Sequence, residues 1–310
     1  MLENNLGLAA ALSFLTLVVV GCVPAADEPQ PPTLIPKVLV LGLDGLRGDG
    51  VPGTESPRMQ DLLDSGSGTY SASTQLTGPT VSGPGWASIL MGVEPQKHGV
   101  YDNTNWQDFD RSYLTFLARA HELSFSTATA INWLPIQTSI IEEDVTDEIV
   151  LGTDQAVADG MAEMLKEADH DVHFVHFDDV DHAGHSSGFS VENPEYVDAV
   201  ETLDPLVGLL LDAIDARSTR ADESWLIVLT SDHGGEGTSH GGVTAEHRAI
   251  PLLLFGDPVV GGPFVSVDSV PGEMDVGFVS HLDVHPTVLQ HLGHPPEAAW
   301  ALDGFVRGLD

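Results

Sequence analysis

The feature that most constrains the fold of this chain is an alternation, from Lys37 onward, of short apolar runs with longer segments of helical periodicity. The run Val38–Leu43 contains no polar side chain, as in a strand buried on both faces of a parallel sheet. Further strands are predicted at Ser124–Ile131, Val172–Phe177, Trp225–Thr230 and Pro251–Phe255. Helices are predicted at about Pro57–Ser65, Ser112–Leu123, Asp154–Ala168, Pro194–Ala216 and His281–Leu292.

This alternation indicates βαβ units, in which each helix connects two parallel strands. We therefore expect an α/β fold with a mostly parallel central sheet flanked by helices on both faces. The chain has 310 residues, no internal repeat and no second linker, so residues 37–310 are expected to form one catalytic domain. Polar clusters follow the predicted strands, at the edge where open α/β sheets bind their ligands.

The first 36 residues are expected to export and anchor this domain. Leu6–Gly21 is almost entirely apolar and is short for a membrane span, and Val19–Cys22 fits a bacterial lipobox whose cysteine is lipidated. Met1–Asn5, however, contains a Glu and no Lys or Arg, unlike the positive start of an export signal. We predict a signal peptide with lipobox over 1–22, a proline-rich tether over 23–36, and a protein lipid-anchored through Cys22 in the bacterial cell envelope, periplasmic or surface-facing.

The charge balance limits the partners that this chain can bind. It has 11 Lys+Arg against 47 Asp+Glu, which gives a net charge of −36. Such a surface repels duplex nucleic acid, because binding there depends on neutralising phosphates with cations. Bound divalent cations would supply the positive charge that an anionic substrate needs.

Four polar clusters follow predicted strands. In Gly42–Arg47, Asp44 comes directly after a buried strand, as a metal ligand or a turn residue. In Gly78–Ser88, small residues surround Ser82, and Pro84 suits the first turn of a helix. The Ser82 hydroxyl is therefore expected near a helix amino terminus, where anions bind. Metal coordination is one way to activate such a serine as a nucleophile. Taken alone, this segment also fits a loop without function.

The third and fourth clusters carry the chemistry of a metal site. Asp178–His185 holds three carboxylates and two imidazoles in eight residues, and Ser231–Gly235 is followed by Ser239–Gly242 with a further histidine. Mixed oxygen and nitrogen ligands suit zinc or manganese better than calcium. Fourteen His and one Cys also indicate binding by imidazole and carboxylate rather than by thiolate.

The order of these motifs resembles the two-metal phosphoesterases of the alkaline phosphatase superfamily, and within it the type I phosphodiesterase/nucleotide pyrophosphatase branch. The resemblance extends over most of the chain from Val38 to Leu292. It rests on Asp44, on Ser82-Gly-Pro84 and the helix that follows to Gly92, on His98-Gly99 and Asp102-Asn103, on Asp181-x-x-Gly-His185 with Gly188 and Tyr196, on Asp232-His233, and on His240–Glu246 leading to Pro251.

The resemblance implies an alkaline phosphatase-like fold and a set of roles. One divalent ion would be held by Asp44, Asp232 and His233, and the other by Asp181, His185 and His240. Ser82 would be the nucleophile and form a phosphoenzyme intermediate, and Asn103 would hydrogen-bond a phosphoryl oxygen. The ions are expected to be Zn²⁺, with Mn²⁺ as the alternative. The expected substrate is a small-molecule phosphoester.

The sequence also departs from the family pattern. The nucleophile is Ser where this branch usually has Thr, and Trp86 replaces a common His. The segment from Gly256 to His281 is too short for the insertion that shapes nucleotide recognition in many relatives. Trp86 also stands where formylglycine sulfatases have Arg.

We therefore predict a phosphodiesterase-like hydrolase. The alternatives on the same site are a phosphomonoesterase and a phosphonate- or sulfate-ester hydrolase. An alternative of another class is a non-catalytic metal-binding envelope lipoprotein.

Overall fold

The computed structural model describes residues 34–106, 108–141, 145–264 and 279–309. The predicted signal peptide, Cys22 and most of the predicted tether lie outside these residues and stay predictions. From Leu34 onward the chain forms one compact unit. Its first strand begins at Ile35, inside the segment predicted as a tether, because Ile35 pairs with Glu223 in the sheet. Within the described ranges, no helix combines the length and hydrophobicity that a membrane span requires.

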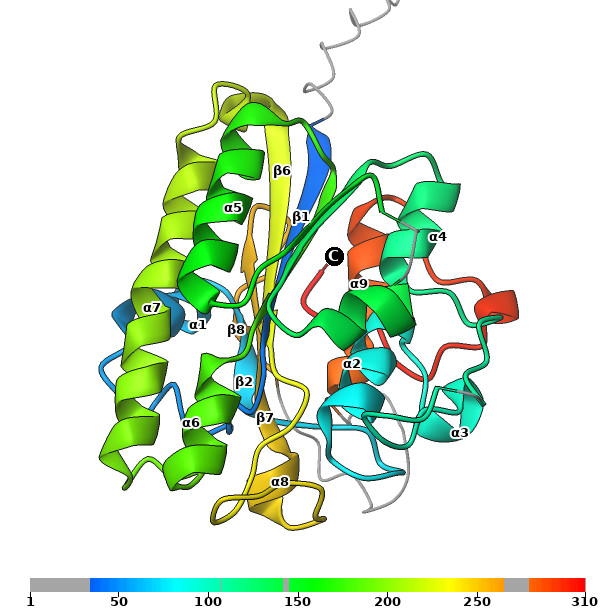
Figure 1. The fold of residues 1–310 in the computed structure, drawn as a ribbon. Helices are drawn as coiled ribbons and strands as arrows, with labels where there is room; N and C mark the ends of the chain where they lie inside the picture. Colours follow the sequence, from blue (N-terminus) through cyan, green and yellow to red (C-terminus); the bar gives the residue numbers. More distant parts are fainter. Residues whose placement is uncertain (1–33, 107, 142–144, 265–278, 310) are drawn as a thin grey trace, which may run out of the picture. The chain divides into compact units, whose positions relative to one another are not determined.

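A central sheet has the strand order β4-β3-β5-β1-β6-β7-β2-β8 (Figure 1). The strands are β1 (Ile35–Leu43), β2 (Ser67–Ser73), β3 (Thr127–Ile131), β4 (Asp147–Val150), β5 (Val172–Phe177), β6 (Glu223–Thr230), β7 (Ala249–Gly256) and β8 (Gly262–Pro263). Pairing is parallel from β4 through to β6, whereas β7 is antiparallel to both β6 and β2. The predicted mostly parallel sheet is thus confirmed.

Helices cover both faces of this sheet, as expected (Figure 1). They are α1 (Pro57–Asp64), α2 (Ser82–Met91), α3 (Pro95–His98), α4 (Phe116–Glu122), α5 (Asp154–Glu167), α6 (Asp179–Ser187), α7 (Pro194–Asp215), α8 (Ala245–Arg248) and α9 (Val284–His291), with short or irregular helical segments η1 (Ile136–Ile141), η2 (Arg220–Asp222), η3 (His281–Asp283) and η4 (Ala298–Trp300). Local signals set several boundaries. The Thr153 side chain accepts a hydrogen bond from Ala156 N at the start of α5, and Asn193 with Pro194 begins α7.

The strands are apolar on both faces because each face packs against a separate layer of helices. Along β1, Leu39, Leu41 and Leu43 join a core with α1, α5 and α7, whereas Val38 and Val40 join a core with α2, α4 and α9. This division follows the two-residue period of a strand, whose side chains alternate between the faces. The uninterrupted apolar run that predicted a buried strand reflects these two cores.

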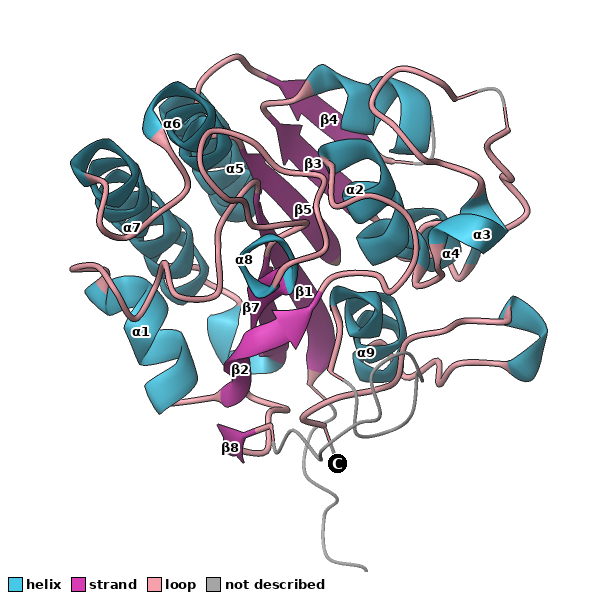
Figure 2. Ribbon diagram, turned by 90° about the horizontal axis from the view of Figure 1, so that it is seen from below, coloured by secondary structure: helices cyan, strands magenta, loops and turns pink. Residues whose placement is uncertain are grey.

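The sheet register brings the polar clusters to one edge. Leu43 is level with Phe177 of β5, and Gly42 is level with Thr230 of β6. Asp44 therefore leaves the sheet beside Asp178 on one side and near Asp232 on the other. Figure 2 views the described chain from this edge, where α8 and the loops after the parallel strands lie.

Candidate metal centre and active site

Two of the predicted ligands, Asp44 and Asp232, extend the neighbouring strands β1 and β6 and are fully buried together with His233. His233 Nε2 lies 3.5 Å from Asp44 Oδ1 and 3.3 Å from Asp232 Oδ2. Single ligand atoms of all three residues fall within 4.8 Å of one another. The geometry therefore provides one candidate set of donors for a metal ion, with two carboxylates and one imidazole.

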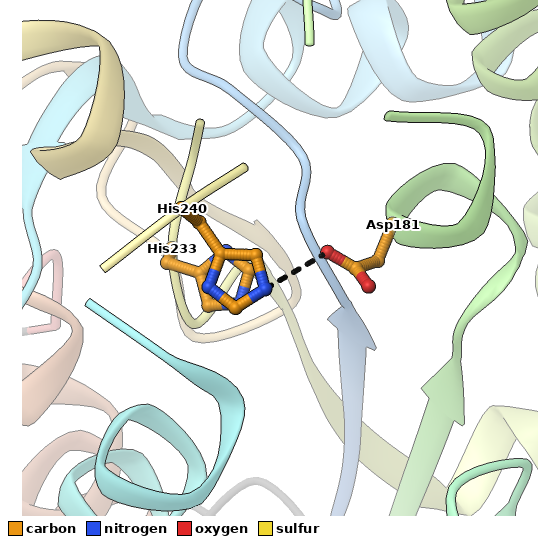
Figure 3. Close-up of side chains that lie close together, drawn as sticks. All are labelled: Asp181, His233 and His240. Carbon is orange, nitrogen blue, oxygen red and sulfur yellow. Dashed lines mark ion pairs between the residues drawn. The ribbon is translucent and has the colours of Figure 1, made fainter. Parts of the chain in front are cut away.

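A second set lies directly beside the first. Asp181 and His185 are one turn apart on α6, with His185 Nε2 3.4 Å from Asp181 Oδ2. His240 Nε2 lies 3.8 Å from Asp181 Oδ1 and 2.9 Å from His185 Nε2. Figure 3 shows Asp181 facing His240, whose ring stacks on His233 with 3.9 Å between ring centroids. All six predicted ligands thus lie in one cluster, in which His233 borders both sets.

Hydrogen bonds to the main chain orient the three histidines. Their Nδ1 atoms donate to main-chain carbonyls: His185 to Thr238 O, His233 to Gly234 O and His240 to Thr80 O. Burial lowers the pKa of His233 well below its usual value and lowers that of His240 to about 4, so both of these rings are neutral. For these two histidines the hydrogen-bond network therefore leaves Nε2 unprotonated, with its lone pair toward the cluster.

The carboxylates of the cluster have oxygens without a hydrogen-bond partner. Asp44 Oδ1, Asp181 Oδ1 and Asp232 Oδ2 are buried and unpaired, and each is the oxygen that lies beside a histidine Nε2. Buried charges without partners are costly, and lone pairs that face carboxylates repel them. These donors fit a divalent cation, which would satisfy the oxygens and the imidazoles together.

The electrostatics of the metal-free site agree with this interpretation. Burial raises the pKa of Asp44 to about 7 and that of Asp181 to about 8, and burial also raises the pKa of Asp232. The described basic residues that lie within 4 Å of these carboxylates are histidines. Without a metal the cluster therefore retains protons that a bound cation would displace.

Ser82 is the first residue of α2 and points into the same cluster. It is 7% exposed, and its Oγ lies 3.4 Å from His233 Nε2. The helix can approach this closely because residue 85 is glycine. A Cβ at Gly85 would lie 2.8 Å from Asp232 Cβ, closer than two carbon atoms can pack. The small residues that mark this motif in the sequence are thus needed to bring Ser82 to the metal ligands.

Asn103 is fixed beside Ser82. Its Oδ1 accepts a hydrogen bond from Gly83 N at 2.7 Å, which identifies Nδ2 as the donor at its other end. Pro84 has no N–H group, and the Gly83 N–H is already used. The donors that the start of α2 could offer to an anion are therefore Asn103 Nδ2 and the Ser82 N–H, which has no partner within the helix.

Thr80 joins the Ser82 loop to the His240 loop. Its Oγ1 donates to Gly242 O at 2.9 Å and accepts from Gly241 N at 3.1 Å, while its carbonyl accepts from His240 Nδ1. This fully buried residue therefore holds a predicted metal ligand and the predicted nucleophile in a fixed relation. The sequence alone does not single out Thr80, because its role depends on contacts with a loop about 160 residues later.

The family model for type I phosphodiesterase/nucleotide pyrophosphatase matches residues 38–132 and 118–252. The chain belongs to this family. The matched segments include Ser82, Asn103 and all six candidate ligands. A comparison with curated proteins finds no match.

Solved structures of the alkaline phosphatase superfamily share the fold of this family member. Murine ectonucleotide pyrophosphatase/phosphodiesterase 5, as an inactive form in complex with AMP, has a TM-score of 0.68 and 12% identity, covering 89% of this chain and 100% of that one. The human protein of the same name has a TM-score of 0.65 and 12% identity, over 86% and 99%. BT1596, a 2-O GAG sulfatase, has a TM-score of 0.65 and 14% identity, over 88% and 73%. At these identities the likeness shows the fold alone.

The two arginines nearest the motifs have partners of their own. Arg47 donates to Asp49 and to the carbonyls of Phe189 and Gly235. Arg111 lies over the Phe109 ring and donates to Ser139 O. These described contacts do not involve Ser82.

Two other histidines near the motifs have separate roles. His98 accepts from Val100 N and donates to Ser88 Oγ, so its role is structural. His182 has a side chain that is 67% exposed and contacts Asp178 at 3.4 Å. Neither belongs to the two candidate ligand sets.

Proposed function

We propose that this protein is a phosphodiesterase that uses two divalent ions and forms a phosphoenzyme intermediate on Ser82. Family membership supports a phosphoric-ester hydrolase. The observation that supports the finer proposal most strongly is the position of Ser82 Oγ, at a helix amino terminus and 3.4 Å from a histidine of the six-ligand cluster.

The ligands divide into two sets. Asp44, Asp232 and His233 would hold the ion next to Ser82, and Asp181, His185 and His240 would hold the other. When bound, divalent ions at these positions would favour the ionised Ser82 hydroxyl and neutralise charge on the phosphoryl group. Zn²⁺ is our first choice because each set mixes imidazole with carboxylate, and Mn²⁺ fits the same donors.

The residues of the chain would then act in two displacements. Ser82 Oγ attacks phosphorus, an O–P bond forms, and the bond to the leaving alcohol breaks as that alcohol takes up a proton. Water attacks the phosphoserine in the second displacement, so that Ser82 regains its proton and the phosphate product leaves. Asn103 Nδ2 and the Ser82 N–H would hold phosphoryl oxygens through both steps.

The partners that Arg47 already has favour diester substrates over monoester substrates. A monoester carries an extra negative charge, for which enzymes commonly provide a guanidinium group. Arg47, the arginine of the Asp44 motif, already pairs with a carboxylate and two carbonyls. A phosphomonoesterase or a phosphonate- or sulfate-ester hydrolase remains the alternative use of the same site.

The test is hydrolysis of bis-p-nitrophenyl phosphate and p-nitrophenyl phosphate by the full chain loaded with Zn²⁺. We expect faster turnover of the diester, and a loss of at least about a thousandfold in Ser82→Ala with both ions still bound. Ser88→Ala is the matched control, because Ser88 belongs to the same helix but hydrogen-bonds His98. It is expected to keep wild-type turnover.

Three other results would each change the conclusion. Faster hydrolysis of the monoester would identify a phosphatase. Turnover that survives in Ser82→Ala would exclude Ser82 as the nucleophile. Two bound ions without Ser82-dependent activity on either ester would favour a metal-binding protein that is not an enzyme.

A further inference from the structure

Asp44 receives two hydrogen bonds on the oxygen that faces away from His233. Trp86 Nε1 donates to Asp44 Oδ2 at 2.8 Å, and His176 Nε2 lies 3.1 Å from the same oxygen. Trp86 and His176 are fully buried, and Asp44 is 1% exposed. These contacts come from α2 and β5, so two separate elements converge on one carboxylate oxygen.

The hydrogen bonds of His176 show which of its nitrogens donates. Trp133 N donates to His176 Nδ1 at 3.4 Å, so the proton of the neutral ring is on Nε2. His176 Nε2 therefore donates to Asp44 rather than offering a lone pair to a metal ion. Asp44, His176 and Asp178 lie close enough together to suggest a third metal site, but this tautomer makes His176 a supporting residue.

With Oδ2 occupied by two donors, only the other oxygen of Asp44 is left to bind an ion. Asp44 Oδ1 has no hydrogen-bond partner and lies 3.5 Å from His233 Nε2. We propose that Trp86 and His176 are positioning residues, which fix the Asp44 carboxylate so that it offers one oxygen to the ion shared with Asp232 and His233. This inference rests on the metal centre of the proposed function.

The surrounding packing holds the indole in place. The Trp86 ring makes edge contacts with Phe174 and His176, at centroid distances of 5.8 and 4.9 Å. A Cβ at Gly42 would lie 2.5 and 2.6 Å from two carbons of the indole ring, so a glycine is required there. Gly42, which begins the Asp44 motif, thus provides the space that Trp86 occupies.

The chain contains a matched control at the opposite end of the sheet. Trp225 is also fully buried, and its Nε1 donates to Glu223 Oε2 at 2.7 Å. Glu223 is paired with Arg217 and is not a candidate metal ligand. Trp225→Phe therefore removes the same indole and the same kind of hydrogen bond as Trp86→Phe, without touching the metal centre.

The experiment measures Zn²⁺ affinity of the full chain in competition with a chromophoric chelator. We expect Trp86→Phe to lower the affinity for one of the two Zn²⁺ ions by about 10- to 100-fold. This is the usual cost of removing a hydrogen-bond partner of a metal ligand. The second ion and both ions of Trp225→Phe are expected to keep wild-type affinity. His176→Leu should repeat the loss, whereas His176→Gln, which retains a donor, should recover most of the affinity.

Each outcome supports or overturns the proposal. Equal Zn²⁺ affinities in Trp86→Phe and Trp225→Phe would overturn it, and so would equal affinities in the two His176 variants. The His176 pair decides the question if circular dichroism shows that Trp86→Phe does not fold. Failure of the wild-type chain to bind Zn²⁺ at all would instead refute the metal centre of the proposed function.

Discussion

At the amino end of the central sheet buried charged groups are paired with groups of opposite charge, whereas at the carboxyl end the described basic neighbours of the buried carboxylates are histidines. Lys37 is 1% exposed and lies 2.8 Å from Asp169 and 2.9 Å from Asp171. Arg217 pairs with Glu223 at 2.7 Å. Burial raises the pKa of Glu223, but hydrogen bonds from Arg217, Thr219 and Trp225 more than offset this and lower it to about 2.

The carboxyl end has the opposite electrostatic result. Burial raises the pKa of Asp44 to about 7 and that of Asp181 to about 8. Since β1 carries Lys37 near its start and is followed by Asp44, one strand connects the two situations. Among the described residues, the basic side chain beside Glu223 is an arginine, whereas those beside Asp44 and Asp181 are histidines. In the proposed function, bound cations would supply the positive charge at the carboxyl end.

The strongest test of this comparison is Asp232→Asn at the carboxyl end. Each Zn²⁺ site at a thousand times its dissociation constant should add about 4 kcal/mol to the free energy of unfolding of the wild type, because only the folded chain forms the site. The variant should lose the gain from the site of Asp44, Asp232 and His233. Its amide can still accept from Gly45 N and can donate to His233 Nε2, so the metal-free variant should be at least as stable as the metal-free wild type.

Urea unfolding with EDTA and with Zn²⁺ measures both effects. If metal-free Asp232→Asn were less stable than metal-free wild type, the carboxyl end would not hold surplus negative charge. The contrast drawn between the two ends of the sheet would then be wrong for the carboxyl end.

Glu223→Gln at the amino end should behave in the opposite way. It leaves the buried Arg217 without its main partner, although an ion pair with the exposed Asp169 remains. Removing one member of a buried pair costs about 3 kcal/mol of unfolding free energy. The same urea titration should show this loss with and without Zn²⁺, and Zn²⁺ affinity should not change. A change in Zn²⁺ affinity would mean that the two ends are coupled.

The pH dependence of the metal-free protein gives the smallest of these effects. In the unfolded chain Asp44 and Asp181 ionise near the reference value of 3.8, whereas in the folded chain their pKa values are about 7 and 8. The folded state therefore binds more protons, and stability should fall between about pH 6.5 and pH 8, by about 1.4 kcal/mol per pH unit for each net proton. Below this range stability should instead rise with pH, because the buried histidines have lowered pKa values and bind fewer protons in the folded state than in the unfolded state.

Urea midpoints measured across this pH range in EDTA check the slope. Saturating Zn²⁺ should abolish it, because a bound cation keeps the carboxylates ionised, and Asp232→Asn should reduce it. A flat profile in EDTA would contradict the surplus charge assigned to the carboxyl end.

The sequence predicted the sheet and the polar clusters at its carboxyl edge well because the strands there are buried on both faces. Val172–Phe177 coincides with β5, and the predicted Trp225–Thr230 lies within β6. The weaker elements were missed. Ser67–Ser73 consists of small and polar residues, and it forms β2 because it pairs with β7. Strand propensity alone gives no such signal, since the pairing partner is distant in the sequence.

The candidate site was predictable where motifs carry the chemistry, but its supporting contacts were not. No helix was predicted over Asp179–Ser187, where Asp, His, Gly and Ser are poor helix formers, yet the segment packs against α7 as the helix α6. The role of Trp86 was unclear from the sequence, and His176 was read only as part of a strand. Their function depends on which carboxylate oxygen they reach, and that follows only from the three-dimensional arrangement.

The wide spacing of the ligands along the chain determines when an ion could bind at the proposed centre. Gly45 N reaches the Asp232 side chain across 187 positions of the sequence, so the centre forms only when β1 and β6 are already paired. A chain in which these strands are not yet paired lacks this geometry. An ion held by the proposed centre would therefore be taken up in the compartment where the sheet forms.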